Sequence, residues 1–223
     1  MIYFTKDFAA FFSDLEKNNN RDWFLQNKKR YESSVKEPFT HLVGELISEL
    51  SEIYPNMTIT PKDAIFRLNR DVRFSKDKTP YKIHMAALIS PGGKKDKTTP
   101  AMYLQANHLD LRVYSGSHML EKDQLYGVRK QIASNLKEFE KLISDKKFVE
   151  TFGEIHGEQN KRLDPEFQKV QEKQPLVANK GFYYFFKLPP KSMTQEGLIN
   201  EIITKYKVAL PLNNFLIKGL KLG

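Results

Sequence analysis

The sequence predicts an α+β fold in which an antiparallel β-sheet packs against N-terminal and C-terminal helices. Apolar residues recur at helical spacing over 5–54 and over 121–220, whereas apolar and polar residues alternate within 64–115. The strand-like segments follow one another with short connections, which favours an antiparallel meander over a parallel sheet. Because no linker rich in proline, glycine and serine divides the chain, we expect a single domain over 1–223.

Helices are expected throughout the N-terminal segment. Thr5 can cap a first helix, and the three asparagines at 18–20 can end it. The apolar face of this helix consists of Phe8, Phe11, Phe12 and Leu15. A second helical segment begins near Arg21. Ser34 and Glu37 have the spacing of a capping box, so we expect a third helix to begin there.

Strand-like patterns occupy the middle of the chain. Residues 64–75 alternate between two faces, one of which is unusually polar. Further strands are expected at 83–89, 101–106 and 109–115. The aromatic segment near 181–188 is rich in residues that favour strands, so we expect it to rejoin the sheet.

Helical spacing returns after the strands. We expect one helix over 125–143 with a break near Asn135, and a short helix over 145–152. The stretch 153–180 is rich in turn formers and charge, as loops are.

Two signals divide the last helices of the chain. Ser192 with Gln195 is a second capping-box pattern, which predicts the start of a helix that contains Leu198. Pro211 is expected to separate that helix from the last one.

Composition excludes several classes of protein. The chain has no cysteine, which rules out disulfides, thiolate metal sites and a cysteine nucleophile. It also contains no P-loop, no nucleophile elbow and no dinucleotide-binding glycine fingerprint. No apolar run is long enough to span a bilayer, and the first residues lack the pattern of a secretory leader. We therefore expect a cytoplasmic protein without a membrane partner.

Positive charge is concentrated in one segment. The net charge is +9 and the sequence pI is about 9.4, a balance that favours anionic partners. Between residues 67 and 82, six cations stand against two aspartates, so this segment carries a charge of +4. Any site for an anion is expected here first.

Three motifs carry a resemblance to a known family: NNRDWF at 19–24, YESSVKEPF at 31–39 and RDVRFSKDKTPYK at 70–82. Together they resemble the bacterial and fungal family of conserved hypothetical proteins termed domain of unknown function 2461. The resemblance extends more weakly to YSGSHMLEKDQLYGVRKQI at 114–132, which looks like the family's glycine-containing segment followed by a helix with an internal arginine, Arg129. Ser115, Ser117 and His118 surround Gly116 there, which departs from the family's pattern. The resemblance carries over no activity.

The basic run has the residue types of a site for a phosphate-bearing ligand, either nucleic acid or a phosphorylated small molecule. Arginine makes forked contacts with phosphate, and lysine supplies mobile charge. Thr79-Pro80 imposes an extended or turn geometry, in which backbone N–H groups can face an anion. The candidate ligand-binding residues are Arg67, Arg70, Asp71, Arg73, Ser75, Lys76, Asp77, Lys78, Tyr81, Lys82, Arg112 and Tyr114.

Other interpretations of the same residues remain open. Asp71 and Asp77 would hold Mg²⁺ in a metal-dependent hydrolase or phosphoryl-transfer enzyme. The run would also suit a protein-interaction domain that binds an acidic partner. As a surface network, its aspartates would pair with its own arginines and contribute little to stability. No organic cofactor is expected, and His108 with Asp110 is a weaker candidate for a metal pair.

Overall fold

The computed structural model describes residues 1–96 and 99–222. The chain divides into two compact units. Unit 1 comprises Met1–Lys94, Tyr103–Val113 and Lys187–Ile203, and unit 2 comprises Lys95–Met102, Tyr114–Phe186 and Thr204–Gly223.

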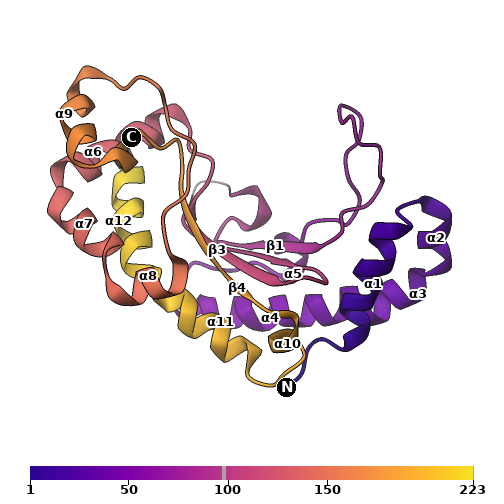
Figure 1. Cartoon of the computed structure of the whole chain (residues 1–223). Coiled ribbons are helices and arrows are strands. Elements are labelled where there is room, and N and C mark those ends of the chain that lie inside the picture. The colour runs from indigo at the N-terminus through magenta and orange to yellow at the C-terminus, as the bar shows by residue number, and fades with distance from the viewer. Residues whose placement is uncertain (97–98, 223) are drawn as a thin grey trace. The chain divides into compact units, whose positions relative to one another are not determined.

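A four-stranded antiparallel sheet with the order β1-β2-β3-β4 confirms the predicted α+β class (Figure 1). Its strands are β1 (Met85–Ile89), β2 (Met102–Ala106), β3 (Leu111–Ser117) and β4 (Phe182–Leu188). In β2 and β3, buried residues alternate with half-exposed ones, which is the pattern of a sheet with one covered face. The aromatic segment near 181–188 joins the sheet as expected.

Gly116 is required where β3 approaches β4. Its φ of +87° lies in a region that other residues rarely adopt. A Cβ at this position would lie 2.1 Å from the carbonyl oxygen of Phe182, closer than any real contact. Both the backbone conformation and the close packing against β4 therefore require glycine at this position of the 114–132 segment.

Unit 1 contains most of the N-terminal helices. They are α1 (Lys6–Lys17), α2 (Arg21–Gln26), α3 (Lys28–Tyr31), α4 (Glu37–Ser51) and α5 (Pro61–Ala64), joined later by α10 (Pro190–Met193) and by the start of α11 (Leu198–Lys207). The expected caps of α1 are confirmed: the Thr5 hydroxyl accepts the Asp7 N–H at 3.3 Å, and the helix ends at Asn18. Helix α4 contacts β1, so the apolar face of this long helix covers part of the sheet.

The predicted helix start at Ser34 and Glu37 is wrong. A π-helix, Glu32–Lys36, connects α3 to α4 without interruption, and no side chain caps α4. Pro38 explains the wider turn. In a regular α-helix its ring would clash with the carbonyl group four residues earlier, that of Ser34, and a π turn relieves such crowding.

Unit 2 contains the remaining helices. They are α6 (Lys122–Ser134), α7 (Leu136–Ile143), α8 (Lys146–Phe152), α9 (Pro165–Lys173), the end of α11 and α12 (Leu210–Leu220). A short 3-10 turn at Pro175–Ala178 also belongs to this unit, and another lies at Gly93–Lys95, where the two units meet in the sequence. The predicted break at Asn135 is confirmed, as is the short helix α8. Helix α9 lies inside the stretch 153–180, whose composition had indicated loops. Ser192 lies within α10 rather than capping α11.

The segment containing Arg129 holds unit 2 together through buried polar contacts. Arg129 is 5% exposed, and its Nε donates to the carbonyl oxygen of Val177 at 2.9 Å. Burial lowers the pKa of its guanidinium group. Also in unit 2, the Asn213 side chain accepts the Tyr184 hydroxyl at 2.6 Å and donates to the Ser115 hydroxyl at 2.9 Å.

No helix among the described residues is long and apolar enough to cross a membrane.

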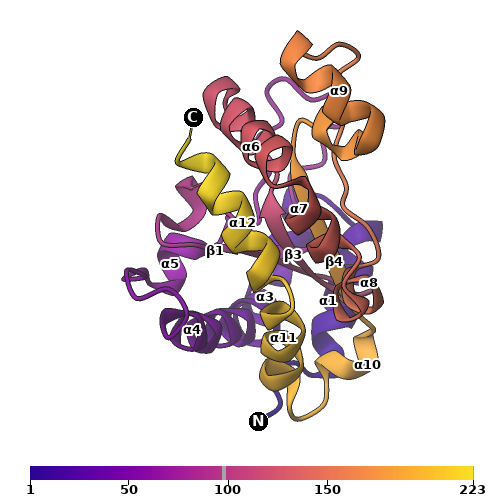
Figure 2. The same ribbon diagram turned by 90° about the vertical axis from the view of Figure 1, so that its left-hand side faces the viewer.

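Helices α6 and α12 pack closely, because Gly219 lets the two backbones approach (Figure 2). Replacing Gly219 by alanine is expected to lower the free energy of unfolding. The new Cβ would lie 2.7 Å from the Cα of Val128, so the helices would have to move apart. Overpacking of this kind costs about 1–3 kcal/mol. Urea denaturation followed by circular dichroism measures the change.

Gly44→Ala is the matched control for this substitution. Gly44 also lies inside a helix, but its added Cβ would meet the Pro61 Cγ at an ordinary distance of 3.6 Å. Alanine is a better helix former than glycine by about 1 kcal/mol, so this variant should be neutral or stabilised. Equal effects of the two substitutions would contradict the close approach at Gly219.

Candidate functional site

Residues 67–82, termed here the basic arm, form an irregular hairpin in unit 1 that continues β1. In Figure 1 it is the purple loop that extends beyond α1 and α2. The expected strand over 64–75 is reduced to isolated bridges of Ile65 with Ala87 and of Asn69 with Tyr81. The two sides are joined by backbone hydrogen bonds, such as Arg70 N–H to the Pro80 carbonyl at 2.8 Å.

A bulge lies at the base of the arm. Phe66 N–H donates to the Ala86 carbonyl, and Lys82 N–H donates to the Leu68 carbonyl, each at 2.9 Å. Between these bonds the outgoing side has one residue, Arg67, and the returning side has three, 83–85. Bulges redirect side chains and are common next to functional sites.

Arg70 stabilises the turn of the arm from inside. Its Nη1 pairs with the Asp77 carboxylate and the Thr79 hydroxyl, and it also donates to the Thr79 carbonyl at 3.2 Å. Asp77 in turn accepts the Thr79 N–H at 2.9 Å. These donors, led by the Thr79 N–H and followed by Arg70, lower the pKa of Asp77 to about 2. Ser75 completes the set, since its hydroxyl lies 3.4 Å from Arg70 Nη2.

Two further cations are engaged in the structure of the arm. Arg73 forms a forked pair with Asp71, with Nε–Oδ1 and Nη2–Oδ2 distances of 3.0 and 2.7 Å. The Arg73 guanidinium is the first cause that lowers the pKa of Asp71. Lys78 donates to the Val72 carbonyl at 3.0 Å. Both aspartates of the run therefore already have partners.

Three other cations of the arm form no such ion pair, although the charge of Arg67 contributes to the lowered pKa of Asp71. Arg67, Lys76 and Lys82 form no ion pair with a carboxylate among residues 1–96 and 99–222. At the tip, Phe74 is 95% exposed, and the Arg73 guanidinium carbon lies 5.8 Å from its ring centroid. The tip thus combines an open aromatic ring with positive charge.

A second group of cations gathers at the base of the arm. Burial and the neighbouring charge of Arg67 lower the pKa of Lys82, whose Nζ lies 5.5 Å from the Phe66 ring centroid. Burial, Lys82 and Arg112 together lower the pKa of His84 to about 4. Arg112 forms an ion pair with Asp110, with an Nε–Oδ2 distance of 2.9 Å. We call Arg67, Lys82, His84 and Arg112 the base cluster.

Tyr81 anchors the arm instead of facing solvent. It is 7% exposed, and its ring stacks on Phe24 with a centroid distance of 4.2 Å. The Asn19 side chain bonds both backbone groups of Tyr81, donating to its carbonyl at 2.9 Å and accepting its N–H at 3.1 Å. The ring centroid of Tyr31 lies 5.2 Å from that of Phe24. The three sequence motifs that suggested a family therefore meet at this anchor.

Two other candidates have contacts with residues outside the arm. Tyr114 belongs to unit 2, where its ring centroid lies 4.8 Å from that of Phe185. His108 lies 3.5 Å from a Glu16 oxygen, and its Nδ1 is buried without a hydrogen-bond partner. No group of three or more histidine, aspartate and glutamate side chains suited to a metal occurs among the described residues.

Sequence reasoning located the cations but missed two features of the site. It placed Phe74 on the apolar side of a strand, whereas the ring is exposed. It did not connect His84 with Lys82 and Arg112, because the bulge that brings these charges to one histidine is not visible in the residue pattern. An aromatic residue between cations in a run that contains proline was the available signal for Phe74.

The comparisons with known proteins agree with the motifs. A family model described as conserved hypothetical protein (DUF2461) matches residues 7–215, which includes the arm and its anchor. No curated protein and no solved structure matches the chain. Because the match extends over most of its length, the chain belongs to the DUF2461 family of conserved hypothetical proteins.

Proposed function

We propose that the protein binds single-stranded nucleic acid through the basic arm. Phosphates would contact the open cations Arg67, Lys76 and Lys82, and a base would stack on Phe74. The observation that carries the proposal is the combination, on one projecting hairpin, of a 95% exposed ring with cations that form no ion pair with a carboxylate among the described residues. Such a pairing of aromatic ring and positive charge is how many proteins hold single strands.

The charge distribution supports a ligand rather than a structural network. The network accounts for Arg70 and Arg73, which pair with Asp77 and Asp71. It does not account for Arg67, Lys76 and Lys82, because these like charges repel one another and exposed pairs would contribute only about 0–1 kcal/mol. The lowered pKa of Lys82 records part of that repulsion, since Arg67 contributes to it. An arriving phosphate would relieve it.

Phe74 favours nucleic acid among the phosphate-bearing ligands. A phosphate alone needs donors and charge, and it gains nothing from an exposed phenyl ring. A nucleotide base has a flat face that stacks on such a ring, with a gain of about 1–3 kcal/mol per base. Arg73 stands over the same ring, so a bound base would meet both an aromatic face and a guanidinium plane.

The base cluster offers a second phosphate position. His84 is neutral near pH 7 because burial and two neighbouring cations oppose its protonation. A phosphate there would favour the charged imidazolium and so supply its own additional donor. The hydrogen bonds between the Asn19 side chain and the Tyr81 backbone would hold the base cluster in place during binding.

Neutralising the open cations is expected to weaken binding of labelled oligodeoxythymidine. In the variant R67Q/K76Q/K82Q, the affinity at fixed salt should fall. The slope of log K against log salt should also flatten by about 2, since each lost phosphate contact on a single strand removes about 0.7. Fluorescence anisotropy at several salt concentrations measures both quantities.

The control for that variant is K6Q/K17Q/K191Q, which removes the same charge from exposed positions of unit 1 outside the arm. It should bind almost as the wild type does. If both triple variants lost affinity equally, the net charge of the protein rather than the arm would account for binding.

Removing the exposed ring is expected to weaken oligonucleotide binding without changing its salt slope. Phe74→Ala should cost about 1–3 kcal/mol, or roughly fivefold to 150-fold in affinity, because a stacked base loses the ring on which it rests. Phe74→Trp should keep the wild-type affinity, because tryptophan also offers a ring for stacking. Leu25→Ala, which truncates another exposed apolar residue of unit 1, should not change the affinity. Wild-type affinity in Phe74→Ala would reject stacking at the tip.

Inorganic phosphate is expected to raise the pKa of His84 from about 4 toward its ordinary value of 6.5. The sign follows from charge, since an anion stabilises the imidazolium form. A pH titration followed by NMR of the histidine ring protons measures the shift, with the exposed His41 as an internal reference. No shift at saturating phosphate would reject the base cluster. A shift in a protein that does not bind the oligonucleotide would instead favour a phosphorylated small molecule as the ligand.

A further inference from the structure

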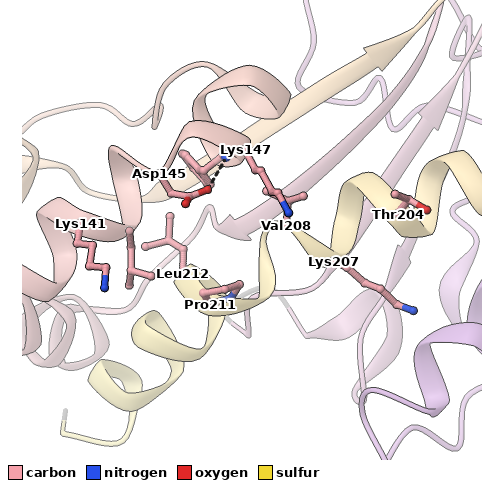
Figure 3. A pocket seen from close by; sticks show the side chains of 10 residues that line it. Lys141, Asp145, Lys147, Thr204, Lys207, Val208, Pro211 and Leu212 are labelled. Atoms are coloured by element: carbon pink, nitrogen blue, oxygen red, sulfur yellow. Dashed lines mark hydrogen bonds between the residues drawn. The ribbon is translucent and has the colours of Figure 1, made fainter.

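Unit 2 contains a groove that the arm and its cations do not involve. It lies between α7 and α8 on one side and the junction of α11 with α12 on the other, and its volume is about 640 Å³ (Figure 3). This volume is within the range of small-molecule sites, about 300–1,000 Å³. All of its lining residues belong to unit 2.

The floor of the groove is apolar. It is formed by Leu142, Phe148, Val208, Pro211 and Leu212. Phe148 and Leu212 are buried, whereas Leu142 and Val208 remain half-exposed and Pro211 is exposed. Exposed apolar area of this kind is unfavourable in water, and covering it gains about 25 cal/mol per Å². An apolar group of a ligand would therefore be held here.

The rim of the groove carries unbalanced positive charge. Lys141, Lys147 and Lys207 line it, and none of the three forms an ion pair with a carboxylate among the described residues. Its one acidic side chain, Asp145, already accepts the Phe148 N–H at 3.1 Å as the cap of α8. In Figure 3 the ammonium group of Lys147 is directed toward Val208, whereas that of Lys207 is directed away from Pro211.

The helix ends explain two of these lysines but not the third. Lys141 and Lys207 lie in the last turns of α7 and α11, where a positive charge interacts favourably with the helix dipole. Lys147 is the second residue of α8, where the same dipole opposes a cation. An anion bound beside Lys147 would offset this unfavourable interaction with the dipole of α8.

We infer that this groove binds a small amphipathic anion, a molecule with an apolar chain and one negatively charged head. The chain would cover Leu142, Val208 and Pro211, and the head would lie at the rim, where Lys141 and Lys147 supply positive charge. Charge complementarity and the apolar floor together select this class, because a purely polar anion would leave the floor exposed and a neutral lipid would leave the lysines uncompensated. The inference goes beyond the proposed binding of nucleic acid and does not depend on it.

Titration calorimetry with dodecanoate below its micellar concentration tests the inference on the whole chain. The wild type should bind dodecanoate, while acetate, which has the head alone, and dodecyltrimethylammonium, which has the chain with a positive head, should bind far more weakly. Failure of dodecanoate to bind would overturn the inference. Equal binding of the cationic amphiphile would overturn it as well, because the lysines would then have no role.

Matched variants locate the binding. K141Q/K147Q should weaken dodecanoate binding about tenfold, as expected for two partly screened charges. The control K137Q/K146Q removes the same charges from α7 and α8 at positions that do not line the groove, and it should bind as the wild type does. Equal losses in the two variants would contradict the site. Val208→Asp should also abolish binding, with circular dichroism confirming the fold, whereas Phe74→Ala should leave dodecanoate binding unchanged.

Discussion

The two hydrogen bonds between the Asn19 side chain and the backbone of Tyr81 are the constraint on which the candidate site depends. An amide side chain that serves both groups of one residue imitates a neighbouring strand, so the return side of the arm is fixed where no strand covers it. The Phe24 ring then stacks on Tyr81. Together these contacts fix the end of the hairpin from which Lys82 and His84 project.

The arm uses part of its charge for its own architecture and leaves part open. Arg70 and Arg73 form ion pairs with the two aspartates of the arm. Arg70 also donates to the hydroxyl and the carbonyl of Thr79, so polar contacts alone order this turn. What remains is positive at the base and aromatic at the tip. A surface network and a ligand site are therefore not exclusive, because the paired residues give the unpaired ones a fixed geometry.

Local patterns predicted those features that local forces decide. Thr5, Asn18 and Asn135 begin or end helices as expected, because capping involves neighbouring residues only. Not every local signal was decisive. The ring of Pro38 crowds the carbonyl of Ser34 and widens a helix that has already begun. Helix α9 forms within a stretch rich in turn formers, although it buries only Phe167 among its apolar residues. In the site, composition identified the cations, but which of them are paired depends on a bulge and a turn that the alternation over 64–75 does not reveal.

The interleaving of the two units has a consequence for dissecting the protein. Each unit is assembled from three separate stretches of sequence, and strands β3 and β4 each supply residues to both. No single cut in the chain yields one intact unit and leaves the other whole. Fragments made by truncation would lack part of both cores, so the arm and the groove must be separated by point substitution or by spectroscopic labels rather than by subcloning.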